Sequence, residues 1–159
     1  MAFSVFLSHS LDPTEQTLAW RLQTLAAAHG IEMYVPQRGA GPPSQAPGLA
    51  VQSAIDRCDC VLAIITAKAS ISVQKELKYA LAKRKLVIPI VQSDFASHPL
   101  VAQFPRVFIF SPGDYPGKVE GEIVEFLKEL HISKEKQQAI GALAALALGI
   151  LLLFSLSEK

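Results

Sequence analysis

Short apolar runs alternate with amphipathic stretches along the first 131 residues of the chain. Runs of apolar or alternating character, typical of strands, occupy Ser4–Ser8, Ile31–Val35, Cys60–Thr66, Leu86–Val91 and Val107–Phe110. Apolar residues recur at helical spacing in four stretches. Three of them separate the first four strands and are marked by Leu18, Leu22 and Leu25, by 49–58, and by Val73, Leu77 and Leu81; the fourth follows the last strand and is marked by Ile123, Leu127 and Leu130. Because helices separate the first four strands and another follows the fifth, we predict an α/β domain with a five-stranded parallel sheet flanked by helices.

Turn residues punctuate this pattern. Asp12 and Pro13 suit the start of the first helix, and Gly30 ends it. The segment from Pro36 to Gly48 is rich in proline and glycine and is the one long irregular loop in the pattern. Long loops in compact domains are usually lids or binding segments, so we expect this loop to border a binding site.

The C-terminal region has a different composition. Residues Ala139 to Leu156 are uncharged and apolar except for Ser155, and 18 helical residues cover about 27 Å, close to the thickness of a bilayer core. We therefore predict one transmembrane helix over 139–156, a juxtamembrane linker over 132–138 and a folded domain over 1–131. The alternative is a buried core helix, but every helical face of the segment is apolar.

Charges and small residues extend this prediction. Lys128, Lys134 and Lys136 precede the apolar segment, whereas only Lys159 follows it, which favours a single-pass membrane protein with a cytoplasmic N-terminal domain. No signal peptide is recognisable at the N-terminus. Within the segment, Gly141, Ala145 and Gly149 recur every four residues, as in helices that pair in membranes, although ordinary use of small residues explains the pattern equally well.

Composition narrows the possible chemistry. The chain has 15 basic and 14 acidic residues and no basic tract, so we expect no nucleic-acid partner. Cys58 and Cys60 lack the further ligands of a zinc site, and we predict buried reduced thiols and no metal. Dinucleotide-binding glycine motifs, P-loops and zinc-protease motifs do not occur.

Polar side chains follow several of the predicted strands. Ser8, His9 and Ser10 follow the first strand, Thr66 ends the third, and Asp94 follows the fourth. Ligands of parallel α/β sheets bind beyond the carboxyl ends of the strands, where the strand order reverses. These residues and the Pro36–Gly48 loop are therefore candidates for a binding site.

Glu76 lies in the helix predicted after the third strand. At 100° per residue its side chain is roughly 80–90° from the centre of the apolar stripe, so we expect the carboxylate at the rim of the core. Its neighbours three and four positions on are Tyr79 and Ala80, neither of which is basic. A solvated helix glutamate is the simpler interpretation of the pattern alone.

Taken together, these segments resemble a Toll/interleukin-1 receptor (TIR) domain of the bacterial kind, over roughly residues 1–131. The resemblance rests on Val5-Phe6-Leu7-Ser8-His9-Ser10, the loop ending in Pro47-Gly48, the run Cys60–Thr66, and Ser70 to Glu76 leading into Leu86–Val91. It implies a flavodoxin-like fold. The pattern S-x-W-x-x-x-E of the family falls on Ser70, Ser72 and Glu76, with Ser72 where the family often has tryptophan.

The resemblance also implies an activity. In enzymatic TIR domains, a glutamate at the position of Glu76 cleaves NAD⁺ between nicotinamide and ribose. Ser8, His9 and Ser10, together with Thr66, Ser70 and Ser72, would then line the NAD⁺ site, and Arg38 in the loop would meet phosphate charge. For His9 a packed or solvent-exposed ring, and for Arg38 a solvated loop cation, are the alternatives.

The resemblance, together with these observations, implies three alternative functions. The first is a membrane-tethered NAD⁺ glycohydrolase acting in bacterial, anti-phage immune or cell-death signalling, which associates with itself through its TIR domain and its transmembrane helix. The second is an enzyme like nucleoside 2-deoxyribosyltransferase, whose related fold also places a helix glutamate at a sugar carbon. The third is a TIR adaptor without catalysis. NAD⁺ is the substrate in the first case, and no resident cofactor is expected.

Overall fold

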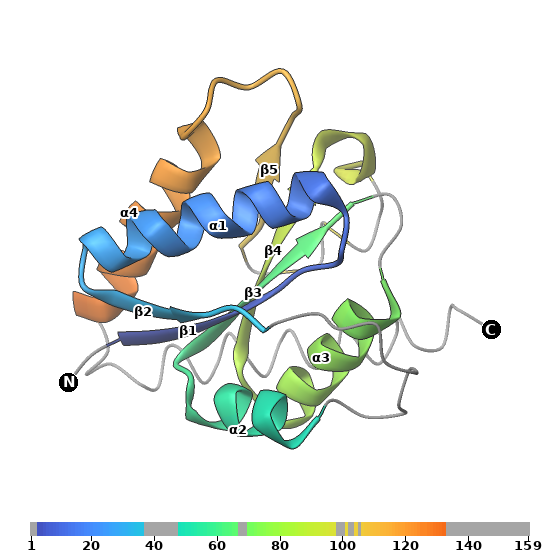
Figure 1. Cartoon of the computed structure of the whole chain (residues 1–159), viewed down its shortest axis with the longest axis vertical. Coiled ribbons are helices and arrows are strands. Elements are labelled where there is room, and N and C mark those ends of the chain that lie inside the picture. The colour runs from blue at the N-terminus through green and yellow to red at the C-terminus, as the bar shows by residue number, and fades with distance from the viewer. Residues whose placement is uncertain are drawn as a thin grey trace.

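A computed structural model describes residues 3–36, 48–66, 70–97, 101, 104 and 106–132 of the chain. Helices and strands alternate along these residues (Figure 1). In chain order they are β1 (Phe3–Ser8), α1 (Pro13–Ala28), β2 (Ile31–Tyr34), α2 (Leu49–Arg57), β3 (Cys60–Ile65), α3 (Ile71–Ala82), β4 (Leu86–Gln92), the short 3₁₀ helix η1 (Ser93–Phe95), β5 (Phe108–Phe110) and α4 (Lys118–Ile132).

The strands form one parallel sheet in the order β2-β1-β3-β4-β5. This confirms the predicted five-stranded parallel α/β fold. The predicted bounds of each strand differ by one residue, as at β5, which begins at Phe108. Because β1 has β2 on one side and β3 on the other, the order reverses at β1 and β3. The carboxyl ends of these two strands form the switch point at which such sheets bind ligands.

The two faces of the sheet bury separate apolar layers. Helices α1 and α4 cover one face, and α2 and α3 cover the other (Figure 1). Strand residues alternate between these layers: Val5 and Leu7 pack with α1 and α4, whereas Phe6 packs with α2 and α3. β3 is buried along nearly its whole length, which explains its continuous apolar sequence.

Helix α1 begins as its sequence predicts. The Asp12 side chain accepts hydrogen bonds from the backbone N–H groups of Thr14 and Glu15, and Pro13 occupies the first turn. Gly30 follows the helix with a φ of +75°, a conformation that glycine adopts without strain.

The predicted transmembrane segment, residues 139–156, lies outside the described residues, as do the linker residues 133–138. Among the residues that the structure does describe, no helix is both long and apolar enough to cross a bilayer.

Candidate active site

Ser8 and Glu76 meet at the carboxyl edge of the sheet. Ser8 is the last residue of β1 and belongs, like Phe6, to the strand positions that face α2 and α3. Its hydroxyl donates a hydrogen bond to Glu76 Oε1 over 2.6 Å, across 68 residues of sequence. The alternation of the strand therefore aims Ser8 at the helix that carries the glutamate.

Glu76 is buried rather than at the rim of the core. Its side chain is 3% exposed and Ser8 is fully buried, so the sequence-based interpretation of a solvated glutamate is wrong. The helical pattern alone underestimated the burial because the end of β1 and the Ser8 hydroxyl cover this flank of α3. A buried carboxyl group requires polar partners, and Ser8 supplies one of them.

The predicted serines at the start of α3 lie differently. Ser70 is the N-cap of the helix, and its hydroxyl accepts a hydrogen bond from the backbone N–H of Val73 at 3.1 Å. Ser72 is exposed, one turn before Glu76 on the same side of the helix. Ser70 thus starts the helix that positions Glu76, and Ser72 lies at the solvent boundary of the site.

His9, Ser10 and Thr66 are brought together on the other side of the switch point. Buried Glu15 of α1, 1% exposed, accepts from the backbone N–H of Ser10 at 2.8 Å and from the Thr66 hydroxyl at 2.8 Å. His9 is also buried, with its Nδ1 2.6 Å from the carbonyl oxygen of Ser10. The ring of His9 is therefore packed rather than solvent-exposed, and its role in an NAD⁺ site stays a prediction.

Glu15 is the residue of this edge that sequence reasoning missed. A glutamate three positions after the N-cap residue Asp12 has the spacing of an ordinary capping box, which gives no reason to expect a long-range contact. Instead, the Glu15 carboxylate accepts hydrogen bonds from Ser10, which follows β1, and from Thr66, which follows β3 and lies 51 positions from Glu15 in the sequence.

Other predicted site residues are not placed in this cluster. Arg38 lies outside the described residues, as does nearly all of the Pro36–Gly48 loop. Asp94 is exposed in η1. Across the described ranges, no group of three or more histidine, cysteine, aspartate or glutamate side chains is arranged to hold a metal ion.

The two cysteines are buried and reduced, as predicted. Burial raises the pKa of the Cys58 thiol from its ordinary value of 9.0 to about 11, although nearby Lys85 opposes the shift. Burial likewise raises the pKa of Cys60, and the neighbouring Cys58 adds to the effect. Both thiols therefore stay protonated near neutral pH, which argues against a nucleophilic role.

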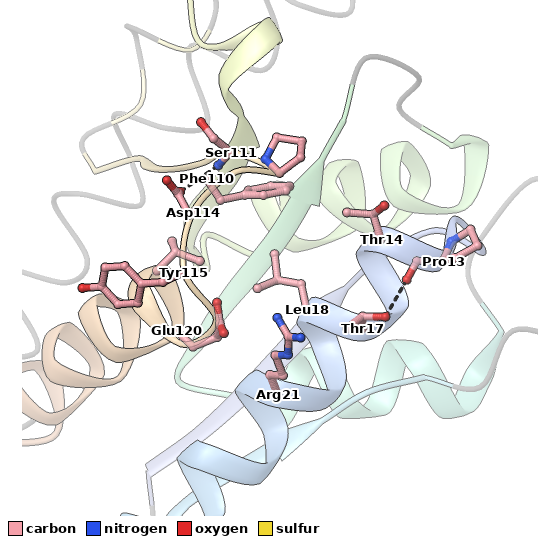
Figure 2. A pocket seen from close by; sticks show the side chains of 12 residues that line it. Pro13, Thr14, Thr17, Leu18, Arg21, Phe110, Ser111, Asp114, Tyr115 and Glu120 are labelled. Atoms are coloured by element: carbon pink, nitrogen blue, oxygen red, sulfur yellow. Dashed lines mark hydrogen bonds between the residues drawn. The ribbon is translucent and has the colours of Figure 1, made fainter.

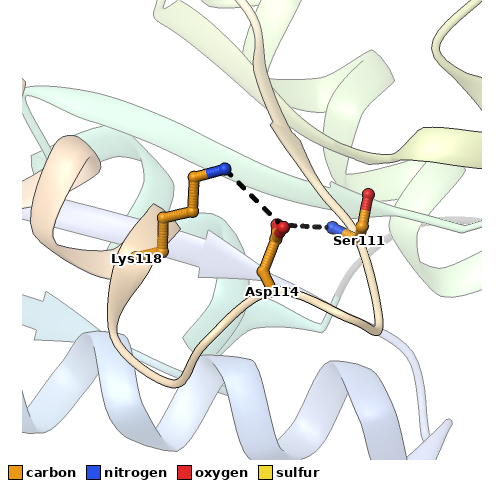
Figure 3. Close-up of polar contacts among 3 residues, drawn as sticks. All are labelled: Ser111, Asp114 and Lys118. Carbon is orange, nitrogen blue, oxygen red and sulfur yellow. Dashed lines mark hydrogen bonds and ion pairs between the residues drawn. The ribbon is translucent and has the colours of Figure 1, made fainter.

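A separate cavity of about 330 Å³ lies on the opposite face of the sheet, between α1 and the segment that joins β5 to α4 (Figure 2). Its walls include Leu18 and Arg21 of α1 and Glu120 of α4. Asp114 organises its rim, because one carboxylate oxygen accepts from the backbone N–H of Ser111 at 2.9 Å and the other lies 3.6 Å from Lys118 Nζ (Figure 3). Glu76 does not line this cavity.

The TIR domain family model matches residues 5–121, which is most of the chain and includes the carboxyl ends of both strands of the switch point. The chain belongs to the TIR domain family. The resemblance seen in the sequence is thereby confirmed at the level of the family. No curated protein sequence matches this TIR domain protein significantly.

Solved structures share the fold at low sequence identity. The CMP N-glycosidase BcmB of Clostridium botulinum is 18% identical, with a TM-score of 0.51 over 79% of this chain and 98% of that chain. The TIR domains of the activated Roq1 resistosome, which recognises the pathogen effector XopQ, are 15% identical, with a TM-score of 0.51 over 94% of this chain and 85% of that chain. The sugar isomerase domain of the RpiR transcription factor from Sphaerobacter thermophilus is 12% identical, with a TM-score of 0.51 over 97% of this chain and 77% of that chain.

Proposed function

We propose that this TIR domain hydrolyses NAD⁺ at the bond between nicotinamide and ribose, with Glu76 as the catalytic residue. The observation that carries the proposal is the buried Glu76 carboxyl group at the switch point, held by the Ser8 hydroxyl at 2.6 Å. Keeping a carboxyl group in an apolar surrounding is costly unless it is well paired, so such a placement is characteristic of functional sites.

The proposed chemistry needs one carboxylate. Nicotinamide leaves as a neutral base, so the leaving group needs little help from an acid. The ribose carbon acquires positive charge as the bond breaks, and a fixed negative charge beside it stabilises that transition state. In this proposal Glu76 supplies the charge, Ser8 fixes the orientation of the carboxylate, and water takes the place of nicotinamide to give ADP-ribose and a proton.

The test is chromatography of NAD⁺ incubated with the full chain and with a Glu76→Gln variant. We expect the variant to lose activity by about 100-fold or more, as when a group that stabilises transition-state charge is removed. Glu120→Gln is the matched control, because Glu120 is another buried helix glutamate, 4% exposed, which accepts one hydrogen bond from the backbone N–H of Gly117 at 2.8 Å. Equal activity of Glu76→Gln and the unaltered chain would exclude Glu76 from the chemistry.

A second candidate is cleavage of a nucleoside or nucleotide N-glycosidic bond other than that of NAD⁺. It is supported by the similar fold of the CMP N-glycosidase, and it includes exchange of bases on deoxynucleosides. The chromatographic assay with CMP or a deoxynucleoside in place of NAD⁺ separates the two candidates. Release of free base that depends on Glu76, without release of nicotinamide from NAD⁺, would favour the second candidate.

A third candidate is a TIR adaptor without catalysis, supported by the similar fold of the resistosome TIR domains. Self-association is a known property of TIR domains and is common to the adaptor and the enzyme. In the adaptor, Glu76→Gln leaves association and signalling unchanged, and no substrate is consumed by the unaltered chain. If the unaltered chain forms a measurable product and Glu76→Gln does not, an adaptor without catalysis is excluded.

We further propose that residues 139–156 anchor the chain in a membrane, with the TIR domain on the cytoplasmic side, and that anchoring promotes activity in bacterial immune or cell-death signalling. A shared tether raises the local concentration of domains to about the millimolar range, which is enough to populate weak contacts. Replacing Gly141, Ala145 and Gly149 with leucine is expected to lower NAD⁺ turnover in membranes, and fusion of an unrelated oligomeriser is expected to restore it. Unchanged turnover would limit the segment to anchoring.

A further inference from the structure

Basic side chains gather at the amino edge of the sheet, opposite the edge that holds Glu76. Arg57 ends α2, and the run Lys83-Arg84-Lys85 joins α3 to β4. Arg57, Lys83 and Arg84 are exposed and Lys85 is half-buried. We call these four residues the basic edge.

Hydrogen bonds hold the two turns of the basic edge side by side. Lys85 Nζ donates to the backbone carbonyl oxygens of Asp56 and Cys58, both at 2.9 Å. The turn from Asp56 to Cys60 also contains Asp59, whose carboxylate accepts from the backbone N–H of Ser4 at 2.9 Å. The four cations therefore outnumber the two aspartates of these turns, and Asp59 is directed at the start of β1.

The chain leaves the domain at this same edge. The ring of His131, in the last turn of α4, stacks on Phe3 at the start of β1, with ring centroids 5.7 Å apart. Figure 1 shows the end of α4 beside the beginning of β1. Ile132, the last residue of α4, is therefore at the amino edge, and the predicted membrane segment follows it after residues 133–138.

The length of that connection limits how the domain can face a bilayer. Six residues cover at most about 20 Å even when fully extended. A helix is about 10 Å across, so the connection is no longer than roughly two helix diameters. A domain tethered this closely presents the edge nearest its attachment point to the lipid surface, and that edge includes the basic edge.

We propose that the basic edge docks on the anionic headgroups of the membrane in which the chain is anchored. This inference rests on the proposed membrane tether and not on NAD⁺ cleavage. Exposed lysine and arginine side chains close to a bilayer are attracted to acidic lipids. Docking in this orientation turns the carboxyl edge, with Ser8 and Glu76, away from the lipid and toward soluble substrate.

The experiment measures the distance of each edge from the lipid in the full chain, reconstituted in nanodiscs that contain nitroxide-labelled headgroups. A fluorophore is attached through Ala82→Cys at the end of α3 or, as the control, through Thr14→Cys at the carboxyl edge; both positions are exposed. The native thiols of Cys58 and Cys60 are buried and do not compete for the label.

Quenching is expected to be at least twofold stronger at position 82 than at position 14 when the disc contains about 30% phosphatidylserine. The difference should shrink in phosphatidylcholine alone and in about 0.5 M NaCl, which screens the attraction. The triple variant R57Q/K83Q/R84Q should abolish the difference in quenching between positions 82 and 14. The variant R21Q/R106Q/K118Q removes the same charge from other parts of the surface and should preserve that difference.

Three results would overturn the proposal. Failure of the full chain to migrate with the discs would refute both the membrane tether and the docking. NAD⁺ turnover measured on the same sample tests the proposed enzymatic activity independently of both. Co-migration with equal quenching at both positions, or without dependence on phosphatidylserine, would refute docking alone. Binding of duplex DNA that the R57Q/K83Q/R84Q variant loses would assign the basic edge to nucleic acid instead.

Discussion

The pairing of Glu15 with Thr66 gives the sharpest prediction about the stability of this TIR domain. Glu15 joins the carboxyl ends of β1 and β3 through Ser10 and Thr66, with both hydrogen bonds at 2.8 Å. Thr66→Val removes one donor and keeps the shape of the side chain. Glu15→Ala removes the acceptor of both hydrogen bonds.

The expected losses follow from the number of bonds. A hydrogen bond to a charged group contributes about 1.5–3 kcal/mol, so Thr66→Val should lower the free energy of unfolding by that amount. Glu15→Ala should lower it by about 3–6 kcal/mol, because it also leaves the N–H of Ser10 without its acceptor. The double variant should lose less than the sum, with a coupling energy of about 1.5–3 kcal/mol, since the bond between Glu15 and Thr66 can be lost only once.

The assay is urea unfolding of the four chains, followed by circular dichroism in the helical region. Thr17→Val is the matched control, because the Thr17 hydroxyl donates to the carbonyl oxygen of Pro13 on the exposed side of the same helix. It should change the free energy of unfolding by less than about 0.5 kcal/mol and add independently to Glu15→Ala. Additive effects of Glu15→Ala and Thr66→Val would refute the bond as a stabilising link between the two strand ends.

Three further predictions concern other parts of the chain. Burial raises the pKa of Cys58 to about 11, so the stability that this thiol contributes is complete below pH 9 and falls as the pH rises toward 11. Urea unfolding at a series of pH values should therefore show that the free energy of unfolding falls more steeply with pH in the unaltered chain than in Cys58→Ala. Ser70→Ala, which removes the N-cap of α3, should cost about 1 kcal/mol by thermal unfolding, whereas exposed Ser72→Ala should cost less than about 0.5 kcal/mol. Finally, the full chain should fractionate with membranes and a chain lacking residues 139–156 should not; recovery of the full chain in the soluble fraction would contradict the anchor.

The periodicity of the chain was sufficient to predict the layered fold. Strand and helix repeats differ, and short continuous apolar segments such as Cys60–Ile65 are typical of strands covered on both faces. Parallel connection through helices then follows from general rules of chain topology. The strand order was not predictable in this way, because it depends on which strands pair across the sheet, and the local pattern is the same for any order.

The contacts of the site were decided by tertiary structure. The sequence nominated Ser8 and Glu76 separately, but their hydrogen bond depends on the alternation of β1 and on the position of α3 beside it. For the same reason, one helical repeat placed Glu76 at the rim, while the neighbouring strand buries it. Glu15 has the local pattern of a helix cap, and only the approach of β3 to α1 brings Thr66 to its second oxygen. The local sequence pattern predicts which face of a helix or strand is apolar. The contacts between polar groups depend instead on how segments far apart in the chain pack together.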